Sequence, residues 1–270
     1  MMAENNLSLS IQIVNKAIGF GASLAGIMNV EDLKKSPSHI IASKIPDFAR
    51  VGTKDVKGKK CDEVQWPDNA KSGVVIAVMH LKEKPELDWW EKGLKGGTKG
   101  NFKLISIFSK LADWIEKSSH IKCIKTPYHI EQGGVYMKDA AVLAGIGCIG
   151  KNNMLVTPKF GPRVRLRVML LDIDFSSTGI LDFDPCIKCE EYCKKICPKN
   201  AFDKKLYSED EFKLKNLPSR TGWYDRYKCN VQMEKDNKDS MDVMIKNNRD
   251  NIQNVKYCRQ CEISCPIGKS

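Results

Sequence analysis

Apolar residues in the first two thirds of the chain recur at helical spacing in some segments and at strand spacing in others. Residues 8–27 predict an amphipathic helix that stops near Gly21 and is followed by a strand. The apolar positions of this helix are Ile11, Val14, Ala17 and Ile18. Residues 73–79 form an apolar run rich in β-branched side chains, which indicates a buried strand, and residues 102–115 predict a second helix.

Two more elements complete this part of the pattern. Residues 135–143 predict a helix that ends near Gly145, and residues 164–173 predict a half-exposed strand, because arginines alternate there with apolar residues. Helices and strands intermix, so we expect one α/β (α+β) domain over residues 1–182. The composition changes near residue 182. We expect a second, smaller domain over residues 183–270, with a polar insertion at 199–257 that contains one helix near Met241 to Asn247.

Composition narrows the class of protein without naming a function. The chain has 270 residues, 42% of them hydrophobic, which suits a globular protein, and no apolar run long enough to span a membrane. The N-terminus lacks a basic region before an apolar stretch and a twin-arginine pair, so we expect a cytoplasmic location. The net charge of +11 fits either solubility or an anionic partner such as RNA, and the dispersed lysines do not decide between them.

Cysteines give the strongest chemical signal. The chain has 11, and eight of them lie between Cys186 and Cys265. Cytosolic thiols stay reduced, so clustered cysteines there indicate metal or redox chemistry before disulfides. The first group is Cys186, Cys189, Cys193 and Cys197, and the second is Cys258, Cys261 and Cys265. Each group ends in Cys-x3-Cys-Pro, which is typical of a two-cluster ferredoxin whose cysteine before proline ligates the other cluster.

Exchanging the last cysteine of each group assigns the ligands of two 4Fe–4S clusters. Cluster one takes Cys186, Cys189, Cys193 and Cys265. Cluster two takes Cys197, Cys258 and Cys261, and Cys229 is the cysteine left in this region to complete it. Zinc is the alternative, because paired C-x2-C groups also build zinc sites, although two Cys-x3-Cys-Pro steps are unusual for zinc. One departure from bacterial ferredoxins is the spacer of three residues between the second and third cysteines of the first group.

A glycine motif precedes the cysteines. Gly145, Gly147 and Gly150 form G-x-G-x-x-G, but they follow a predicted helix and precede a strand, which is the reverse of a dinucleotide-binding turn. The helix running into Ala-Gly-Ile-Gly-Cys-Ile-Gly-Lys-Asn, the following apolar strand, Gly161 and the double cysteine motif together resemble the epoxyqueuosine reductases. They also resemble the related corrinoid-dependent reductive dehalogenases.

This resemblance implies a fold, cofactors and site residues. The N-terminal domain would have a fold like that of flavin reductases and cobalamin-processing proteins, before a small ferredoxin-like domain. It would bind cobalamin or another corrinoid, with flavin as the alternative. Gly145, Gly147 and Gly150 would let the backbone approach the corrin face. Lys151 and Asn152 would hold propionamide or phosphate groups of the corrinoid.

The resemblance also suggests how the reaction would be supplied with protons and electrons. Alignment on the glycine turn places Glu131 at the position of the family's acid, and Tyr136 is a rival because dehalogenases use a tyrosine. The alternative for Glu131 is a surface or helix-capping role, and for Tyr136 a packed aromatic ring. A low-potential carrier such as ferredoxin or flavodoxin would donate electrons.

Three functions stay open from the sequence. The first is a corrinoid-dependent oxidoreductase acting on a small molecule or a modified nucleoside. The second is a ferredoxin-like electron-transfer or corrinoid-reactivating protein without its own substrate. The third is an RNA-modification enzyme. Epoxyqueuosine reductases carry a helical-repeat domain after the clusters that binds tRNA, and this chain ends five residues after Cys265, so we expect that domain to be absent.

Overall fold

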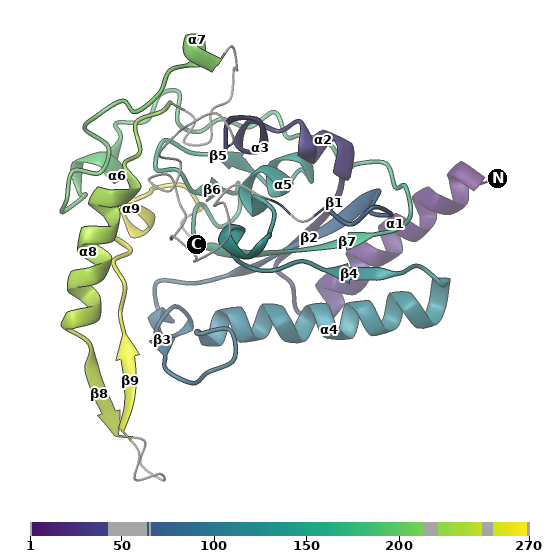
Figure 1. The fold of residues 1–270 in the computed structure, drawn as a ribbon, viewed down its shortest axis with the longest axis horizontal. Coiled ribbons are helices and arrows are strands. Elements are labelled where there is room, and N and C mark those ends of the chain that lie inside the picture. Colours follow the sequence, from purple (N-terminus) through teal and green to yellow (C-terminus); the bar gives the residue numbers. More distant parts are fainter. Residues whose placement is uncertain (1, 43–63, 65, 213–220, 245–250, 269–270) are drawn as a thin grey trace.

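The computed structural model describes residues 2–42, 64, 66–212, 221–244 and 251–268, and its centre is a four-stranded sheet (Figure 1). The strands follow the order β1 (Leu24–Asn29), β2 (Ser72–Met79), β7 (Val164–Leu171) and β4 (Cys123–Lys125). All three neighbouring pairs are antiparallel. The two predicted strands at 73–79 and 164–173 are confirmed as the central pair.

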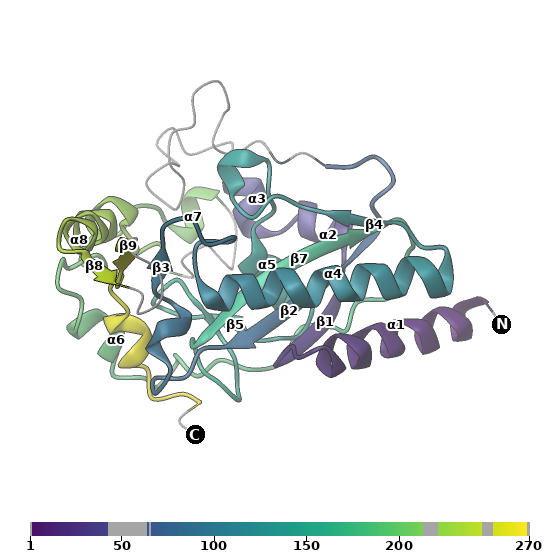
Figure 2. The ribbon, with the colours of Figure 1, turned by 90° about the horizontal axis from the view of Figure 1, so that it is seen from below.

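Helices cover both faces of this sheet (Figures 1 and 2). One face carries α1 (Met2–Gly19) and α4 (Lys99–Ser119), and the other carries α2 (Val30–Lys34), α3 (Pro37–Ala42) and α5 (Met137–Leu143). Successive side chains of a strand point to opposite faces. Accordingly, Val74 and Ile76 belong to the core beneath α1 and α4, whereas Val75 lies in the core shared with α2 and α5. The sheet is therefore buried on both sides.

The predicted helices exist, and the apolar face of the first one was predicted in part. Ala17 is buried and Val14 packs against the core, whereas Ile11 and Ile18 are 52% and 43% exposed and Ile13, which was not predicted, is buried. This helix has apolar side chains on two sides, so spacing alone does not say which side meets the sheet. Gly21, with φ of +105°, ends the element as predicted. Among the described residues, no helix combines the length and the apolar character needed to cross a membrane.

The cysteine-rich region contains short helices and a hairpin. Its elements are α6 (Tyr192–Lys195), α7 (Glu209–Phe212), α8 (Arg226–Lys238), β8 (Met241–Met244), β9 (Asn251–Val255) and α9 (Gln260–Ile263). The helix predicted near Met241 to Asn247 is wrong for residues 241–244, which form β8; the rest of that prediction lies outside the described residues. The side-chain cap of Asp225, which accepts the N–H of Tyr227 at 2.9 Å, starts the helix earlier instead.

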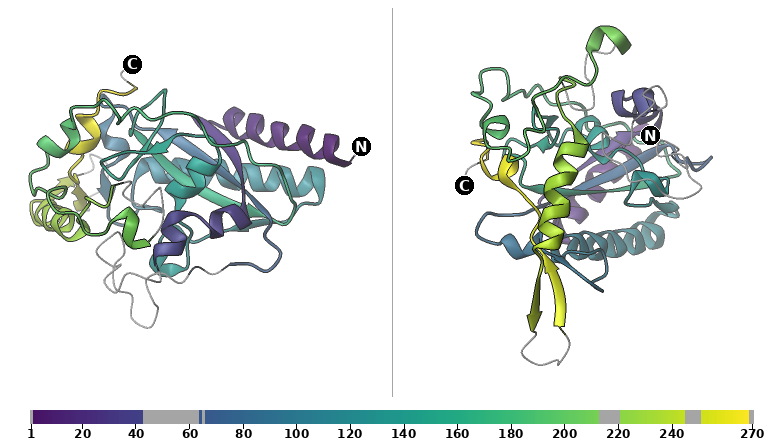
Figure 3. Two further views of the ribbon diagram at one scale, coloured as in Figure 1. Left: turned by 90° about the horizontal axis from the view of Figure 1, so that it is seen from above. Right: turned by 60° about the vertical axis from the view of Figure 1, so that its left-hand side comes forward.

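A second sheet joins segments that are far apart in sequence. The strand β3 (Trp90–Glu91) pairs with β9, which pairs with β8, and both pairings are antiparallel. Trp90 lies opposite Val255, which is fully buried. Helix α8 and the β8–β9 hairpin lie end to end along one side of the molecule (Figure 3). The pairing of β3 with β9 therefore attaches the β8–β9 hairpin to the segment that leads into α4.

Candidate functional site

The structure brings the first cysteine group together with Cys265. Cys186, Cys189, Cys193 and Cys265 line one cavity. Burial raises the pKa of Cys193 to about 11, with further upward contributions from the other three cysteines. A thiol from the second sequence motif thus lies beside the first group, and the assignment of these four cysteines to one cluster stays a prediction.

The remaining four cysteines form a separate group. Cys197, Cys229 and Cys261 pack against a small core of Ala201, Phe202 and Tyr224. The pKa of Cys258 is raised by burial, and the nearby Cys229 and Cys197 add to this rise. Helix α8 delivers Cys229 to this group, because Asp225 at its N-terminus donates its backbone N–H to Ala201 at 2.7 Å. Cys258 is the exposed member of the quartet.

Four thiols around one cavity are a donor set that can hold an iron–sulfur cluster, and zinc stays the alternative. A zinc site needs four ligand atoms, each roughly 2.0–2.3 Å from one ion. In a 4Fe–4S cluster, each thiolate binds a different iron, so four thiols can be further apart around a larger body. The four thiols around one cavity are compatible with binding such a cluster.

The glycine turn packs tightly against the protein. Its strands β5 (Cys148–Ile149) and β6 (Leu155–Val156) form a two-stranded ribbon. A Cβ at Gly147 would lie 2.3 Å from the carbonyl oxygen of Val156, and one at Gly145 would lie 2.4 Å from that of Gly179. Only glycine fits at these contacts. A Cβ at Gly150 would lie 3.5 Å from the sulfur of Cys186, so this end of the turn adjoins the first quartet.

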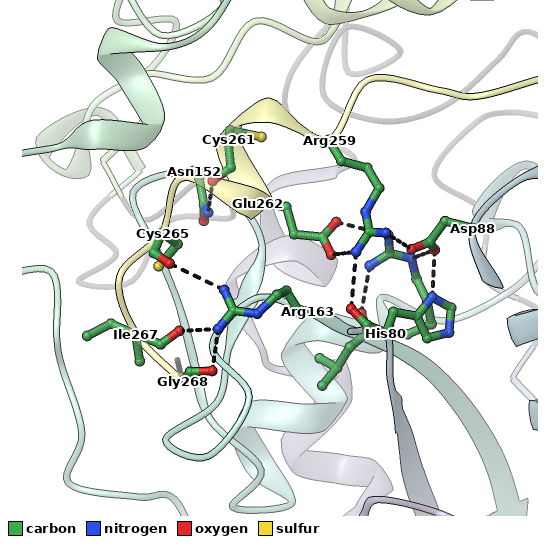
Figure 4. A network of polar contacts seen from close by, with 12 residues as sticks. His80, Asp88, Asn152, Arg163, Arg259, Cys261, Glu262, Cys265, Ile267 and Gly268 are labelled. Atoms are coloured by element: carbon green, nitrogen blue, oxygen red, sulfur yellow. Dashed lines mark hydrogen bonds and ion pairs between the residues drawn. The ribbon is translucent and has the colours of Figure 1, made fainter. Parts of the chain in front are cut away.

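Lys151 and Asn152 connect the turn to the cysteine segments. The ammonium of Lys151 lies 2.6 Å from Oε1 of Glu191, and the hydrogen bond from Lys151 is the main cause that lowers the pKa of Glu191. Asn152 is buried and its Nδ2 donates to the carbonyl oxygen of Cys261 at 3.5 Å (Figure 4). Its Oδ1 accepts the N–H of Met154 at 3.2 Å. Both side chains that the resemblance assigns to a corrinoid therefore already bind protein groups.

The two proton-donor candidates lie just before α5. Glu131 belongs to the short 3-10 helix η3 (Ile130–Gln132), and Tyr136 stands at the N-terminus of α5. The Tyr136 ring packs edge-on against His39 with centroids 4.8 Å apart, and its backbone N–H donates to Nε2 of His39 at 3.4 Å. Burial lowers the pKa of His39 to about 4. The sequence did not link His39 to Tyr136, because 97 positions separate them.

The same region contains a buried lysine that the sequence did not single out. Lys138 Nζ donates to the carbonyl oxygen of Asn153 at 2.5 Å, and burial lowers its pKa to about 8. Its neighbour Asp139 accepts hydrogen bonds from the N–H and the hydroxyl of Ser38, at 2.9 and 2.7 Å. These contacts hold the start of α5 between the glycine turn and α3.

A buried charge network joins β7 to the second cysteine motif (Figure 4). Asp88 lies 2.8 Å from Nε of Arg165 and 2.6 Å from Nη1 of Arg259. Glu262 pairs with the same two arginines, at 2.9 Å from Nη2 of Arg165. Burial raises the pKa of Asp88, but the hydrogen bond from His80 and the two arginines outweigh it, so that this pKa is lowered. The negative charges of Asp88 and Glu262 thus offset the positive charges of the two arginines.

Comparisons with known proteins agree with the resemblance in the sequence. No family model matches the chain. Over 99 residues, or 33% of this chain, it is 30% identical to a tetrachloroethene reductive dehalogenase of Dehalobacter restrictus, and it spans 17% of that protein. Over 274 residues, it is 23% identical to an epoxyqueuosine reductase of Lactococcus garvieae, covering 97% of this chain and 70% of the relative.

Solved structures share the fold over nearly the whole chain. The epoxyqueuosine reductase of Streptococcus thermophilus superposes with a TM-score of 0.60 at 19% identity, covering 96% of this chain and 66% of that one. A catabolic reductive dehalogenase in complex with 3-bromo-4-hydroxybenzoic acid gives 0.60 at 18% identity, covering 94% of this chain and 31% of that one. The mixed α/β fold is therefore common to all three proteins.

Proposed function

We propose that the chain is an iron–sulfur oxidoreductase of the epoxyqueuosine reductase type, with two 4Fe–4S clusters. One observation carries this proposal: eight cysteines gather into two separate quartets, and each quartet takes one cysteine from the other sequence motif. The similarity in sequence and fold to epoxyqueuosine reductases, over more than nine tenths of the chain, supports it. When bound, such clusters store and pass electrons one at a time.

The proposed ligands are the two quartets described above. Cluster one would be held by Cys186, Cys189, Cys193 and Cys265, and cluster two by Cys197, Cys229, Cys258 and Cys261. The chain supplies the surroundings. The N–H of Ala201 donates to the sulfur of Cys197 at 3.3 Å, which offsets negative charge on that thiolate. Phe202 and Tyr224 are buried and shield Cys229 from water, whereas Cys258 is exposed.

The proposal divides the chain at residue 182. Residues 1–182 would form the unit that resembles flavin reductases and cobalamin-processing proteins, and residues 183–270 a ferredoxin-like unit with an insertion at 199–257. The β3–β9 pairing and the Asp88 network join the two parts, so we expect them to unfold together.

Electrons would come from a low-potential carrier such as ferredoxin or flavodoxin. A groove with an empty volume of about 1150 Å³ runs past the exposed Cys258. Lys82 and Lys256 lie in it, and the Lys256 ammonium lies 4.3 Å from the Trp89 ring centroid. Positive side chains beside an exposed ligand suit an acidic carrier, whose approach they would accelerate. The second quartet is therefore the proposed side of electron entry.

The corrinoid is the weakest part of the resemblance. Lys151 and Asn152 bind protein groups, and the Cβ positions of Gly145 and Gly147 face protein backbone, so these residues do not form a corrinoid site in this arrangement. The second candidate function, an electron-transfer or corrinoid-reactivating protein, therefore stays the alternative. In the leading proposal, Glu131 or Tyr136 donates the proton to the substrate.

The proposed substrate class is a small molecule or a modified nucleoside. A solved epoxyqueuosine reductase contains an epoxyqueuosine-modified tRNA stem loop, and it superposes with a TM-score of 0.60 at 18% identity. The present chain covers 66% of that protein. A tRNA substrate is therefore part of the proposal, with the isolated modified nucleoside as the alternative.

One experiment separates the two candidate functions. The protein is purified without oxygen, reconstituted with iron and sulfide, and titrated with cob(II)alamin while EPR spectra are recorded. For a corrinoid reductase we expect a protein-bound cobalt signal that saturates near one equivalent, and reduction of epoxyqueuosine in a modified tRNA stem loop by the loaded protein. Clusters without any bound cobalt would establish the electron carrier, and a flavin titration would follow.

A further inference from the structure

Arg163 lies directly before β7 and points toward the first quartet. Its side chain is 4% exposed. The guanidinium donates to the carbonyl oxygens of Cys265 at 3.3 Å and Ile267 at 2.7 Å, and also to that of Gly268 (Figure 4). All three acceptors belong to the turn that begins with a proposed cluster ligand. The arginine thus holds the chain on both sides of the proline that follows Cys265.

This guanidinium cannot easily escape to solvent. A Cβ on Gly161 would lie 2.1 Å from the carbonyl oxygen of Ile267, and one on Gly268 would lie 2.1 Å from the backbone nitrogen of Gly161. The turn that carries Arg163 and the turn after Cys265 therefore touch backbone to backbone. A positive charge enclosed in this way is fixed relative to the cavity of the first quartet.

Within the part of the chain that the structure describes, no carboxylate pairs with Arg163. This distinguishes it from Arg165, two positions further along, which pairs with Asp88 and Glu262. Burying a cation without an anion is costly, and neutral carbonyl acceptors offset only part of the cost. The arrangement is explained if an anion occupies the adjoining cavity. A cluster with four thiolates is such an anion, and it becomes more negative on reduction.

We propose that Arg163 is the counter-charge of the cluster held by Cys186, Cys189, Cys193 and Cys265, and that it raises the reduction potential of this cluster. This inference rests on the proposed function. A fixed cation nearby stabilises the reduced state more than the oxidised state, and net charge is one determinant of cluster potential. The four-residue network beside the second quartet is balanced, so it gives no such net bias.

Redox titration of the full-length, reconstituted protein tests this inference, with EPR as the readout. The wave of the first quartet is identified as the one that Cys189→Ala removes. Arg163→Met deletes the charge and Arg163→Lys keeps it. The matched control is Arg167→Met, because Arg167 follows four positions later, within β7, and its guanidinium donates to Oδ1 of Asn101 at 3.2 Å.

We expect Arg163→Met to lower the reduced-to-oxidised ratio of the first cluster at fixed potential at least tenfold, a shift of about 59 mV for one electron. Arg163→Lys should shift it much less, and Arg167→Met should not shift it. Loss of the first cluster from Arg163→Met but not from Arg163→Lys would also support the counter-charge. Equal shifts in both Arg163 variants, or none, would overturn the inference while the clusters stand. A wild-type protein that binds no iron and sulfide would overturn the proposed function with it.

Discussion

The two cysteine quartets have the same number of thiols but different surroundings. The first adjoins the glycine turn, and its buried cation, Arg163, contacts only backbone carbonyls among the described residues. The second adjoins two aromatic rings and a balanced network in which Asp88 and Glu262 pair with two arginines. Cys258 of the second quartet is exposed. The spacing of the cysteines predicts two clusters. Residues from distant elements give the two quartets different surroundings.

The different surroundings of the two quartets suggest different roles in electron transfer. A site with an exposed ligand and lysines nearby suits exchange of electrons with another protein, and a site with a fixed buried cation suits holding an electron. Both features depend on β7 and on the loop before α4, which lie outside the cysteine motifs. Arg163, directly before β7, and Arg165, within β7, therefore connect the central sheet to the segment that carries the second cysteine motif.

The largest expected effect comes from breaking the exchange of cysteines between the motifs. Cys265→Ala should remove the first cluster, lowering the iron content from about eight to about four atoms per chain. The surviving EPR signal should match that of Cys189→Ala. Cys123→Ala is the control, because burial raises the pKa of Cys123 to about 12 and keeps this thiol protonated in β4. If Cys265→Ala instead removed the same signal as Cys258→Ala, the exchanged assignment would be wrong.

The next effect concerns the balanced network of the second site. Glu262 is 2% exposed, and Glu262→Gln would leave two buried arginines with one acid. We expect the free energy of unfolding to fall by about 3–5 kcal/mol, and the second cluster to be released at a lower urea concentration than the first. Glu31→Gln, which removes an exposed pair with Lys34, should change neither quantity. Parallel loss of both clusters would show that the network is not specific to one site.

A smaller effect concerns the contribution of His39 to the pH dependence of folding stability. The folded pKa of His39, about 4, lies below its unfolded value of 6.5, so the unfolded state binds more protons between these values. Stability must then fall as the pH decreases from about 6.5. At pH 5.5 the loss is about 1.2 kcal/mol relative to pH 7. His39→Gln should remove this part of the pH dependence in urea titrations, and an unchanged slope would refute its assignment to His39.

The smallest predicted effect concerns Tyr224, whose ring packs against Phe202 beside the second quartet. Tyr224 accepts a hydrogen bond from Arg226 at 3.4 Å, and burial raises the pKa of its hydroxyl. Tyr224→Phe keeps the ring contact with Phe202 and should cost about 1 kcal/mol of stability. The EPR signal of the second cluster should broaden or shift slightly, with the first unchanged. A change confined to the first signal would contradict the placement of Tyr224.

Local patterns predicted much of this architecture. The central strands follow from short apolar runs, and the grouping of the cysteines follows from spacing that acts over a few residues. The helix expected near residues 241–247 failed because β8 depends on pairing with β9, a partner that local periodicity does not reveal. Two of the four apolar positions predicted for α1, Ile11 and Ile18, are exposed because this helix has apolar side chains on two sides.

Polar contacts between residues far apart in the chain could not be predicted from local sequence patterns, for the same reason. Asp88 meets Arg259 across more than 170 positions, and His39 meets Tyr136 across 97. The alternation of Arg163, Arg165 and Arg167 with apolar residues was visible, but it predicted a half-exposed strand. The structure instead buries Arg163 and gives Arg165 two acidic partners.

The central claim is that the eight cysteines hold two 4Fe–4S clusters. Native mass spectrometry of the anaerobically reconstituted protein tests it most directly, because intact clusters and single metal ions differ in mass. We predict one dominant species carrying two 4Fe–4S clusters, and a species with one cluster in Cys189→Ala and in Cys229→Ala. A dominant species with zinc ions, or with one cluster that Cys229→Ala leaves intact, would contradict the account.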